Sequence, residues 1–199
     1  MVVGVCPAYL PNIHYMAWVV SQKEIALVTH NPYQKQTFRN RTEIYGANGK
    51  LKLTIPIVHS KTKERQIDEA VAIHYENSWQ KDHWKSLEAA YRSSPFFEFY
   101  EDDFHPFYHQ KFEKLMDFNI ALIQKVLSLV DAEVKLLPKE KTGDEFNDMI
   151  IAKYEVKKEN PHYQQVFQSK HGFINNLSIL DLLFNLGPQS LEYLGQVDH

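Results

Sequence analysis

The chain has 199 residues, of which 44% are hydrophobic and 24% are charged. This composition excludes a disordered chain and provides enough apolar surface for a single folded domain over residues 1–199. The formal net charge of -3 gives no basic field that would attract nucleic acid. No basic segment followed by a long apolar run begins the chain, and no stretch reaches the roughly 20 apolar residues of a membrane span. We therefore expect a cytoplasmic protein with no nucleic-acid partner and no membrane insertion.

The first part of the chain has the pattern of a parallel strand, helix, strand unit. Residues 2–6 and 24–29 are apolar runs of strand length, and residues 13–20 form an apolar stretch after Pro11, which fits the first turn of a helix. The single cysteine, Cys6, has apolar neighbours. We therefore expect a buried thiol in the first strand and no disulfide.

A β-hairpin is predicted next. Residues 42–45 and 51–58 flank an Asn48-Gly49 pair, which favours a tight turn between antiparallel strands. Apolar and polar residues alternate in the second of these segments, so one face should be buried. Pro56 belongs near a strand end or edge because it cannot donate a hydrogen bond to a sheet. Residues 71–75 indicate one further strand.

The second half of the chain changes to a helical period. Apolar residues spaced three and four apart predict a helix from Trp79 to Tyr91 and a long helix over residues 112–129. The other predicted elements are a short strand over residues 134–137, a charged loop over 139–144 and a helix over 146–154. A last helix is predicted to start at Ser178, with Asp181 as a second capping side chain, and to end at Gly187-Pro188. The expected fold class is α/β, with an N-terminal mixed sheet that contains a parallel unit and a hairpin, followed by a mainly helical C-terminal half.

The polar run over residues 31–41 is the main candidate for a ligand site. It concentrates cations, amides and aromatic rings, which are Lys35, Arg39 and Arg41, Gln34, Gln36 and Asn40, and Tyr33 and Phe38. Arginine binds phosphate or carboxylate through two parallel hydrogen bonds, and amides both donate to and accept from sugar hydroxyls. The alternative is a solvated connection. The position after a parallel strand, where open α/β sheets place ligands, favours the ligand site.

Residues 7–15 should face the polar run across the same edge of the sheet, because they follow the first strand. Tyr9 and Tyr15 would then offer flat surfaces on which a sugar can stack. A proline-rich turn ending in His14 is also similar to nucleotidylyl-transfer enzymes, where helix N-terminal N–H groups hold phosphate, although those enzymes usually have two histidines in the motif. The other interpretation is that both tyrosines pack in the core and His14 caps the helix or faces solvent.

Ten histidines raise the question of a metal ion or a general base. His105 and His109 are spaced as two ligands on one helical face, but no third ligand accompanies them, so no metal site is predicted. His83 is the predicted base because histidine titrates near neutral pH, and its alternative role is packing between two tryptophans. The sequence identifies no cofactor and does not fix the oligomeric state.

In their order along the chain, these segments resemble the WbqC-like family of bacterial proteins. The resemblance covers nearly the whole chain. The segments that carry it are Pro7-Ala8-Tyr9-Leu10-Pro11-Asn12-Ile13-His14-Tyr15, Tyr33-Gln34-Lys35 with Asn40-Arg41, Trp79 with Tyr91, and Leu177-Ser178-Ile179-Leu180-Asp181-Leu182-Leu183-Phe184-Asn185. The family commonly has glycine at position 14, where this chain has histidine.

The resemblance implies a cytoplasmic protein of O-antigen or other surface-polysaccharide biosynthesis that transfers a glycyl or related acyl group to a sugar. Tyr15, Lys35, Asn40 and Arg41 fall on motif positions of the family and are expected in the ligand site. In this hypothesis the three cations of the polar run neutralise phosphate of a sugar or nucleotide-sugar ligand, Gln34 and Asn40 orient the sugar, Tyr9 or Tyr15 stacks on it, and His83 removes the acceptor proton.

Two alternatives stay open at this point. One is a noncatalytic carbohydrate-binding or complex-forming protein that uses the same cationic and aromatic surface. The other is a nucleotidylyl transferase-like, nucleotide-binding enzyme, which would need a phosphate site at the helix that begins near Pro11.

Overall fold

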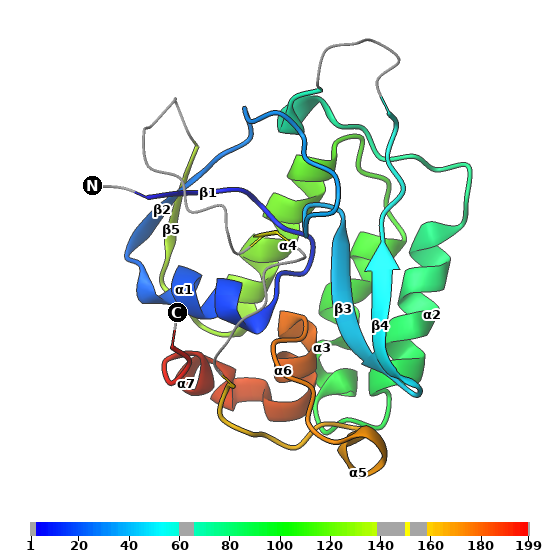
Figure 1. Cartoon of the computed structure of the whole chain (residues 1–199), viewed down its shortest axis with the longest axis vertical. Coiled ribbons are helices and arrows are strands. Elements are labelled where there is room, and N and C mark those ends of the chain that lie inside the picture. Colours follow the sequence, from blue (N-terminus) through cyan, green and yellow to red (C-terminus); the bar gives the residue numbers. More distant parts are fainter. Residues whose placement is uncertain (1–2, 60–65, 139–149, 152–158, 199) are drawn as a thin grey trace.

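The computed structural model describes residues 3–59, 66–138, 150–151 and 159–198. Its N-terminal part is a parallel unit of β1 (Gly4–Val5), α1 (Ile13–Ser21) and β2 (Glu24–Leu27). β2 pairs in parallel with β1 on one side and with β5 (Lys135–Pro138) on the other, which gives a small sheet of order β1-β2-β5 (Figure 1). The predicted strand, helix, strand unit is confirmed.

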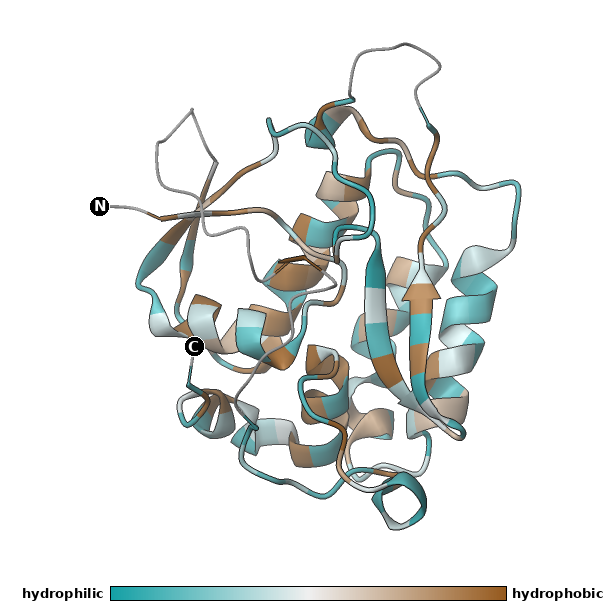
Figure 2. Cartoon of the chain, in the orientation of Figure 1, coloured by the Kyte–Doolittle hydropathy of each residue, from teal (hydrophilic) through white to brown (hydrophobic). Residues whose placement is uncertain are grey.

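The hairpin is formed by β3 (Arg41–Gly46) and β4 (Gly49–Thr54), which pair antiparallel. Gly49 closes the turn with a φ of +99°, a conformation that glycine adopts without steric cost. Hydrophobic and hydrophilic residues alternate along β4 (Figure 2), and Leu53 is buried while Lys52 is exposed. β4 ends at Thr54, earlier than predicted. The N–H of Ile55 still donates to the carbonyl of Asn40 in the register of the hairpin, but Pro56 has no N–H with which to continue the pairing.

The second half of the chain is mainly helical, as predicted. The α-helices are α2 (Trp79–Tyr91), α3 (Phe97–Phe104), α4 (Leu115–Leu129), α5 (Gln168–His171), α6 (Ile179–Leu186) and α7 (Ser190–Leu194), and short 3-10 helices occur at η1 (Asp68–Ala70), η2 (His105–Tyr108) and η4 (Gly187–Gln189). In the view of Figure 1, α4 lies between the parallel sheet and the hairpin. α2 runs beside the hairpin and contacts β3. The α/β fold class is therefore confirmed.

Some local predictions differ from the structure. Residues 71–75 do not form a strand, because Ala72 and Ile73 each make a single bridge to a different segment, at Lys114 and Ile57. Pairing that changes partner after one residue cannot build a ladder. The loop predicted over residues 139–144 lies outside the described residues, and so does the helix predicted over 146–154 apart from residues 150–151.

The start of α6 is only partly as predicted. The Ser178 hydroxyl accepts a hydrogen bond from the N–H of Leu180, so Ser178 is the expected N-cap. The Asp181 carboxylate instead accepts hydrogen bonds from the Tyr163 hydroxyl and the Gln165 amide. Asp181 therefore holds the segment that precedes α5 against α6.

Candidate functional site

The segment after β1 and the polar run after β2 lie side by side, as the sequence predicted. The N–H of Tyr9 donates to the carbonyl of Phe38 at 2.9 Å, and the Thr42 hydroxyl donates to the carbonyl of Leu10 at 2.8 Å. Leu10 and Gln36 have φ values of 41° and 61°, which are unfavourable for side-chain-bearing residues. Backbone strain of this kind occurs preferentially at functional sites, so the junction of the two loops is the best-supported location for one.

Asn119 on α4 joins the two loops, and sequence reasoning missed it. Its side chain is fully buried, and its amide donates to the carbonyls of Pro7 at 3.1 Å and of Arg39 at 2.7 Å. The signal was present in the sequence. Asn119 lies four residues after Leu115 and three before Leu122, on the apolar stripe of the helix, where a polar residue needs a buried partner.

Arg39 is buried inside the junction rather than exposed on the loop. Its Nε lies 2.9 Å from both carboxylate oxygens of Asp68, and the two side chains are 2% and 0% exposed. Burying two charges is costly unless they are paired, which explains why Asp68 is placed at the start of η1 directly against the guanidinium. Nη1 of Arg39 is buried and has no hydrogen-bond acceptor among the residues that the structure describes.

Arg41 and Tyr33 extend this group toward the surface. Arg41 is half-buried, and its Nε is a second buried donor without an acceptor in the described ranges. Burial raises the pKa of Tyr33 to about 12, although the nearby charges of Arg39 and Arg41 oppose that rise. The phenol is therefore protonated at neutral pH and can donate a hydrogen bond. We call Tyr33, Arg39, Arg41 and Asp68 the arginine cluster.

The remaining predicted loop residues have different surroundings. Gln34 and Lys35 are exposed in the same loop. Asn40 is buried, and its side-chain amide donates to the carbonyl of Ile55 at 2.9 Å. Asn40 therefore secures the start of the hairpin, and Gln34 and Lys35 are the predicted residues that solvent reaches most freely.

Both predicted stacking residues are buried in the core. Tyr15 is 1% exposed, and its hydroxyl donates to the carbonyl of Cys6 at 3.1 Å. The Tyr9 ring is fully buried, with its hydroxyl 2.9 Å from Nδ1 of His83 and 2.9 Å from the Tyr108 hydroxyl. Neither ring presents a face to solvent, so a sugar cannot stack on either one without a rearrangement of the core.

His83 belongs to the same buried network. Its side chain is 5% exposed, and its ring lies 5.1 Å from the Trp79 ring in an edge-on arrangement. Burial lowers the pKa of His83 to about 4, against the opposing effects of the Thr54 backbone and Asp82. The imidazole is therefore neutral at physiological pH and tied to Tyr9. The role of His83 as a base stays a prediction.

The start of α1 is already saturated with hydrogen bonds. The N–H groups of residues 13–16 donate, in order, to the Leu177 carbonyl, the Asn176 side chain, the Asn12 side chain and the Asn12 carbonyl. A phosphate at this helix end would have to displace these partners. The geometry therefore gives no support to the nucleotidylyl-transfer alternative.

Comparisons with known proteins show the family of the chain. The model of the WbqC-like protein family matches residues 6–153 and 141–193. The chain belongs to this family. This WbqC-like chain is also 23% identical to the uncharacterized protein Rv1507c of Mycobacterium tuberculosis, over 94% of each of the two chains. No solved structure matches it significantly.

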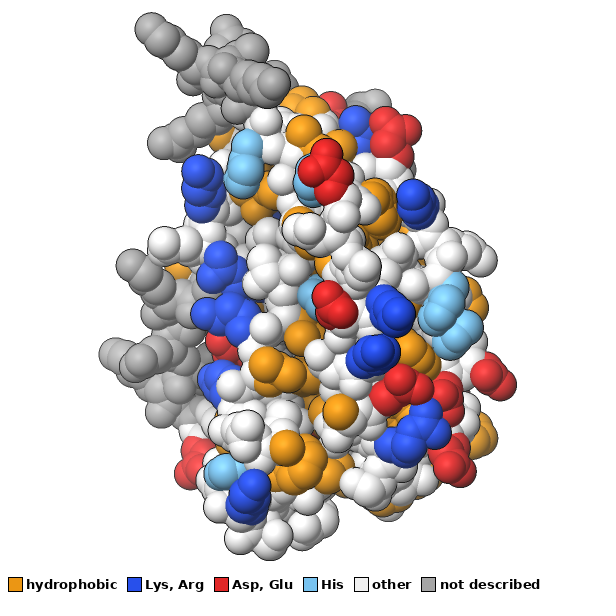
Figure 3. Space-filling model, turned by 90° about the vertical axis from the view of Figure 1, so that its right-hand side faces the viewer, with side chains coloured by type: hydrophobic (Ala, Val, Ile, Leu, Met, Phe, Trp, Pro, Cys, Tyr) orange, Lys and Arg blue, Asp and Glu red, His pale blue; other side chains and the backbone are white. Residues whose placement is uncertain are grey.

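Charged side chains are unevenly distributed on the face that contains α2. In Figure 3, several lysine and arginine side chains lie along the left of this face, and basic and acidic side chains are mixed on its right. In the described part of the chain, no group of three or more histidine, cysteine or acidic residues could hold a metal ion. Nor do those residues include a helix of the length and apolarity that a bilayer crossing requires.

Proposed function

We propose that this protein is a transferase of bacterial surface-polysaccharide (O-antigen) biosynthesis that moves an aminoacyl, such as glycyl, or related acyl group onto a sugar. In this proposal the arginine cluster binds the anionic part of a nucleotide-linked sugar, with Lys35 and Gln34 beside it. Family membership and the meeting of the two motif-bearing loops support the proposal.

The observation that carries the proposal is the pair of buried arginine donors without acceptors. A buried donor with no partner costs about 1–3 kcal/mol, which an incoming phosphate oxygen would recover. The pairing between Arg39 and Asp68 leaves the charge of Arg41 uncompensated by any ion pair among the described residues. An anion would therefore be stabilised both by charge and by geometry.

The proposed contribution to catalysis is positioning and charge neutralisation. The acceptor oxygen or nitrogen of the sugar attacks the acyl carbonyl, the bond to the donor's leaving group breaks, and the acceptor loses its proton. Arg41 and Lys35 would hold the phosphate of the nucleotide-linked ligand while this occurs, and Gln34 would hydrogen-bond to the sugar. The acceptor proton passes to the departing group of the donor, so the products are the acylated sugar and the protonated leaving group.

One observation favours a second candidate, a noncatalytic carbohydrate-binding protein. No hydrogen bond in the described part of the chain joins a histidine to Tyr33, Arg39 or Arg41, and the predicted base His83 is buried with a pKa of about 4. A binding protein needs no titrating base, whereas a transferase needs a group that accepts the acceptor proton.

The test compares Arg41→Gln and Lys35→Gln with a matched control, Lys52→Gln, which removes the same charge from an exposed position on β4. We expect each loop variant to weaken the binding of a nucleotide sugar about tenfold, because each removes a charge-assisted hydrogen bond, and we expect Lys52→Gln to leave binding unchanged. Calorimetric titration at low and high salt measures the effect. Equal affinities in all four proteins would contradict the proposed site.

A transfer assay separates the two candidates. The intact chain is incubated with aminoacyl donors and nucleotide sugars, and mass spectrometry records whether the sugar gains an acyl group. Binding that depends on Arg41 without any mass gain across the panel supports the noncatalytic candidate. A mass gain that is lost in Arg41→Gln supports the transferase.

A further inference from the structure

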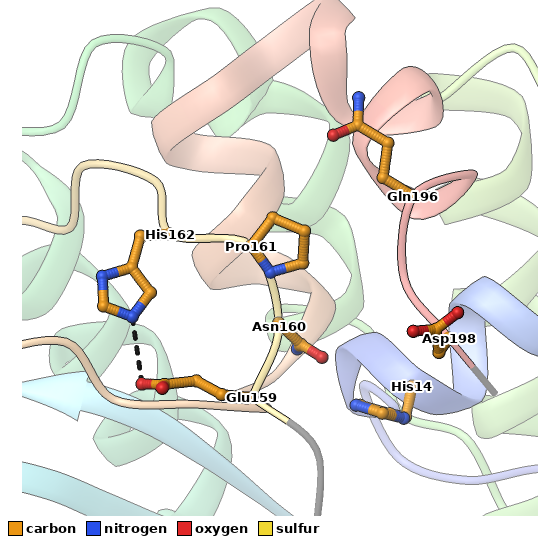
Figure 4. A pocket seen from close by; sticks show the side chains of 7 residues that line it. All are labelled: His14, Glu159, Asn160, Pro161, His162, Gln196 and Asp198. Atoms are coloured by element: carbon orange, nitrogen blue, oxygen red, sulfur yellow. Dashed lines mark hydrogen bonds and ion pairs between the residues drawn. The ribbon is translucent and has the colours of Figure 1, made fainter.

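A recess of about 370 Å³ lies on a part of the molecule that shares no residue with the arginine cluster. Its walls come from the first turn of α1, from residues 159–162 and from the C-terminal residues 196–198 (Figure 4). A volume of this size is more than ten times that of one water molecule and falls at the lower end of the range for small-molecule sites. The recess is therefore large enough for a single sugar ring.

The lining of the recess includes several polar side chains but no lysine or arginine. It includes two carboxylates, two imidazoles and two carboxamides, which belong to Glu159, Asp198, His14, His162, Asn160 and Gln196. Carboxylates repel phosphate and accept hydrogen bonds from hydroxyl groups. The two carboxylates thus disfavour the anionic ligand proposed for the arginine cluster, and the lining suits a neutral ligand rich in hydroxyls.

Asn160 gives independent support for a ligand in the recess. Its side chain is 4% exposed, and Figure 4 shows its carboxamide on the side of the segment that faces His14, with the oxygen nearer to His14 than the nitrogen in this view. Its backbone N–H is occupied by the Asn175 side chain, but its Nδ2 is buried without an acceptor in the described part of the chain. A ligand oxygen placed in the recess would supply the missing acceptor.

The segment that presents Asn160 is held in place from several directions. The Tyr193 hydroxyl donates to the carbonyl of Pro161 at 2.5 Å, which attaches the segment to α7. His162 pairs with Glu159 at 3.0 Å and stacks on Phe173 with 4.2 Å between ring centroids. These contacts fix the wall before any ligand arrives, which lowers the entropy cost of binding.

We propose that this recess binds a neutral, hydroxyl-rich ligand of the size of a monosaccharide. A sugar hydroxyl can accept from the Asn160 amide while it donates to a carboxylate on the rim, and a sugar ring presents several such neutral hydroxyls at once. The proposal goes beyond the proposed function, because it concerns a second site that takes an unphosphorylated sugar.

The test uses the full chain and ligand-observed saturation-transfer NMR with glucose, galactose and N-acetylglucosamine. We expect at least one of them to bind with a millimolar dissociation constant, and glucose phosphate to bind this site more weakly. Asn160→Asp keeps the shape of the side chain and removes its donor, so binding should weaken about tenfold. Asn77→Asp is the matched control, since it introduces the same charge at an exposed position that does not line the recess.

Two further variants make the outcome decisive. Gln196→Ala shortens an exposed rim residue, so it should weaken binding even if Asn160→Asp does not fold. Arg41→Gln should bind the neutral sugars normally, which separates this site from the arginine cluster. The proposal is overturned if none of the three sugars binds at tens of millimolar, or if binding is unchanged in every folded variant of the recess.

Discussion

At the scale of single residues, buried polar side chains determine how the two loops meet. Arg39 and Asp68 are almost fully enclosed, and Asn119 joins the loops through two backbone carbonyls. Such groups are costly to bury, and their hydrogen bonds form only when the other segments are in place. These residues therefore position the arginine cluster, whereas Arg41 and Lys35 are the side chains that a ligand can reach.

Replacing Arg39 tests this division. Arg39→Met should lower the free energy of unfolding by about 3–5 kcal/mol, because the carboxylate of Asp68 loses the ion pair that compensates its burial. Urea unfolding followed by circular dichroism measures the change. As a control, Lys50→Met removes a half-exposed partner of Glu43 and should cost no more than about 1 kcal/mol. If both variants lost the same free energy of unfolding, the buried pair would contribute no more to stability than the exposed one.

At the scale of elements, local sequence signals determine some helices and strands, and contacts with distant segments determine others. The hairpin forms where an Asn-Gly pair separates two alternating segments, and α4 follows the apolar spacing of its own residues. Residues 71–75 have the composition of a strand but bridge two different segments at single residues. Whether an extended segment becomes a strand depends on partners elsewhere in the chain, and no local pattern contains that information.

The end of α6 depends on one glycine. Gly187 has a φ of +55°, and a Cβ built there would lie 2.5 Å from a ring carbon of Phe96. Gly187→Ala should therefore lower the free energy of unfolding by more than about 2 kcal/mol, through backbone strain and overlap with a ring. The matched substitution Gly195→Ala has a φ of -68° and its nearest neighbour at 3.4 Å, so it should have little effect. Equal denaturation midpoints for the two variants would refute this account.

At the scale of the whole molecule, two buried groups titrate in opposite directions. Burial lowers the pKa of His83 from 6.5 to about 4. Burial raises the pKa of Asp181 from 3.8 to about 6, although hydrogen bonds from Tyr163, Tyr91 and Gln165 oppose the rise. Between these values the folded protein has one proton more than the unfolded chain at Asp181 and one proton fewer at His83. Their contributions to the pH dependence of stability therefore largely cancel.

Single substitutions should separate the two opposing effects of pH on the free energy of unfolding. In Asp181→Asn only His83 remains, so stability should rise by on the order of 3 kcal/mol as the pH increases from about 4 to about 6.5. In His83→Gln only Asp181 remains, so stability should fall by a similar amount over nearly the same range. Urea midpoints measured across this pH range, relative to the wild-type chain, give both slopes. If the free energy of unfolding changed with pH in the same way in all three proteins, His83 and Asp181 would not have opposing effects.

The sequence by itself determined the parallel unit, the hairpin, the main helices, the family and the loop that contributes Tyr33, Arg39 and Arg41 to the arginine cluster. Each of these follows from neighbours along the chain, through spacing, turn chemistry or motif order. A single domain over residues 1–199 stays a prediction of the same kind.

Only the tertiary structure decided which polar residues are exposed. Arg39 and Asn40 are buried while Lys35 is exposed in the same run, because Asp68, Ile55 and Asn119 reach them from distant segments. Burial is a property of those long-range contacts, and residue type does not fix it.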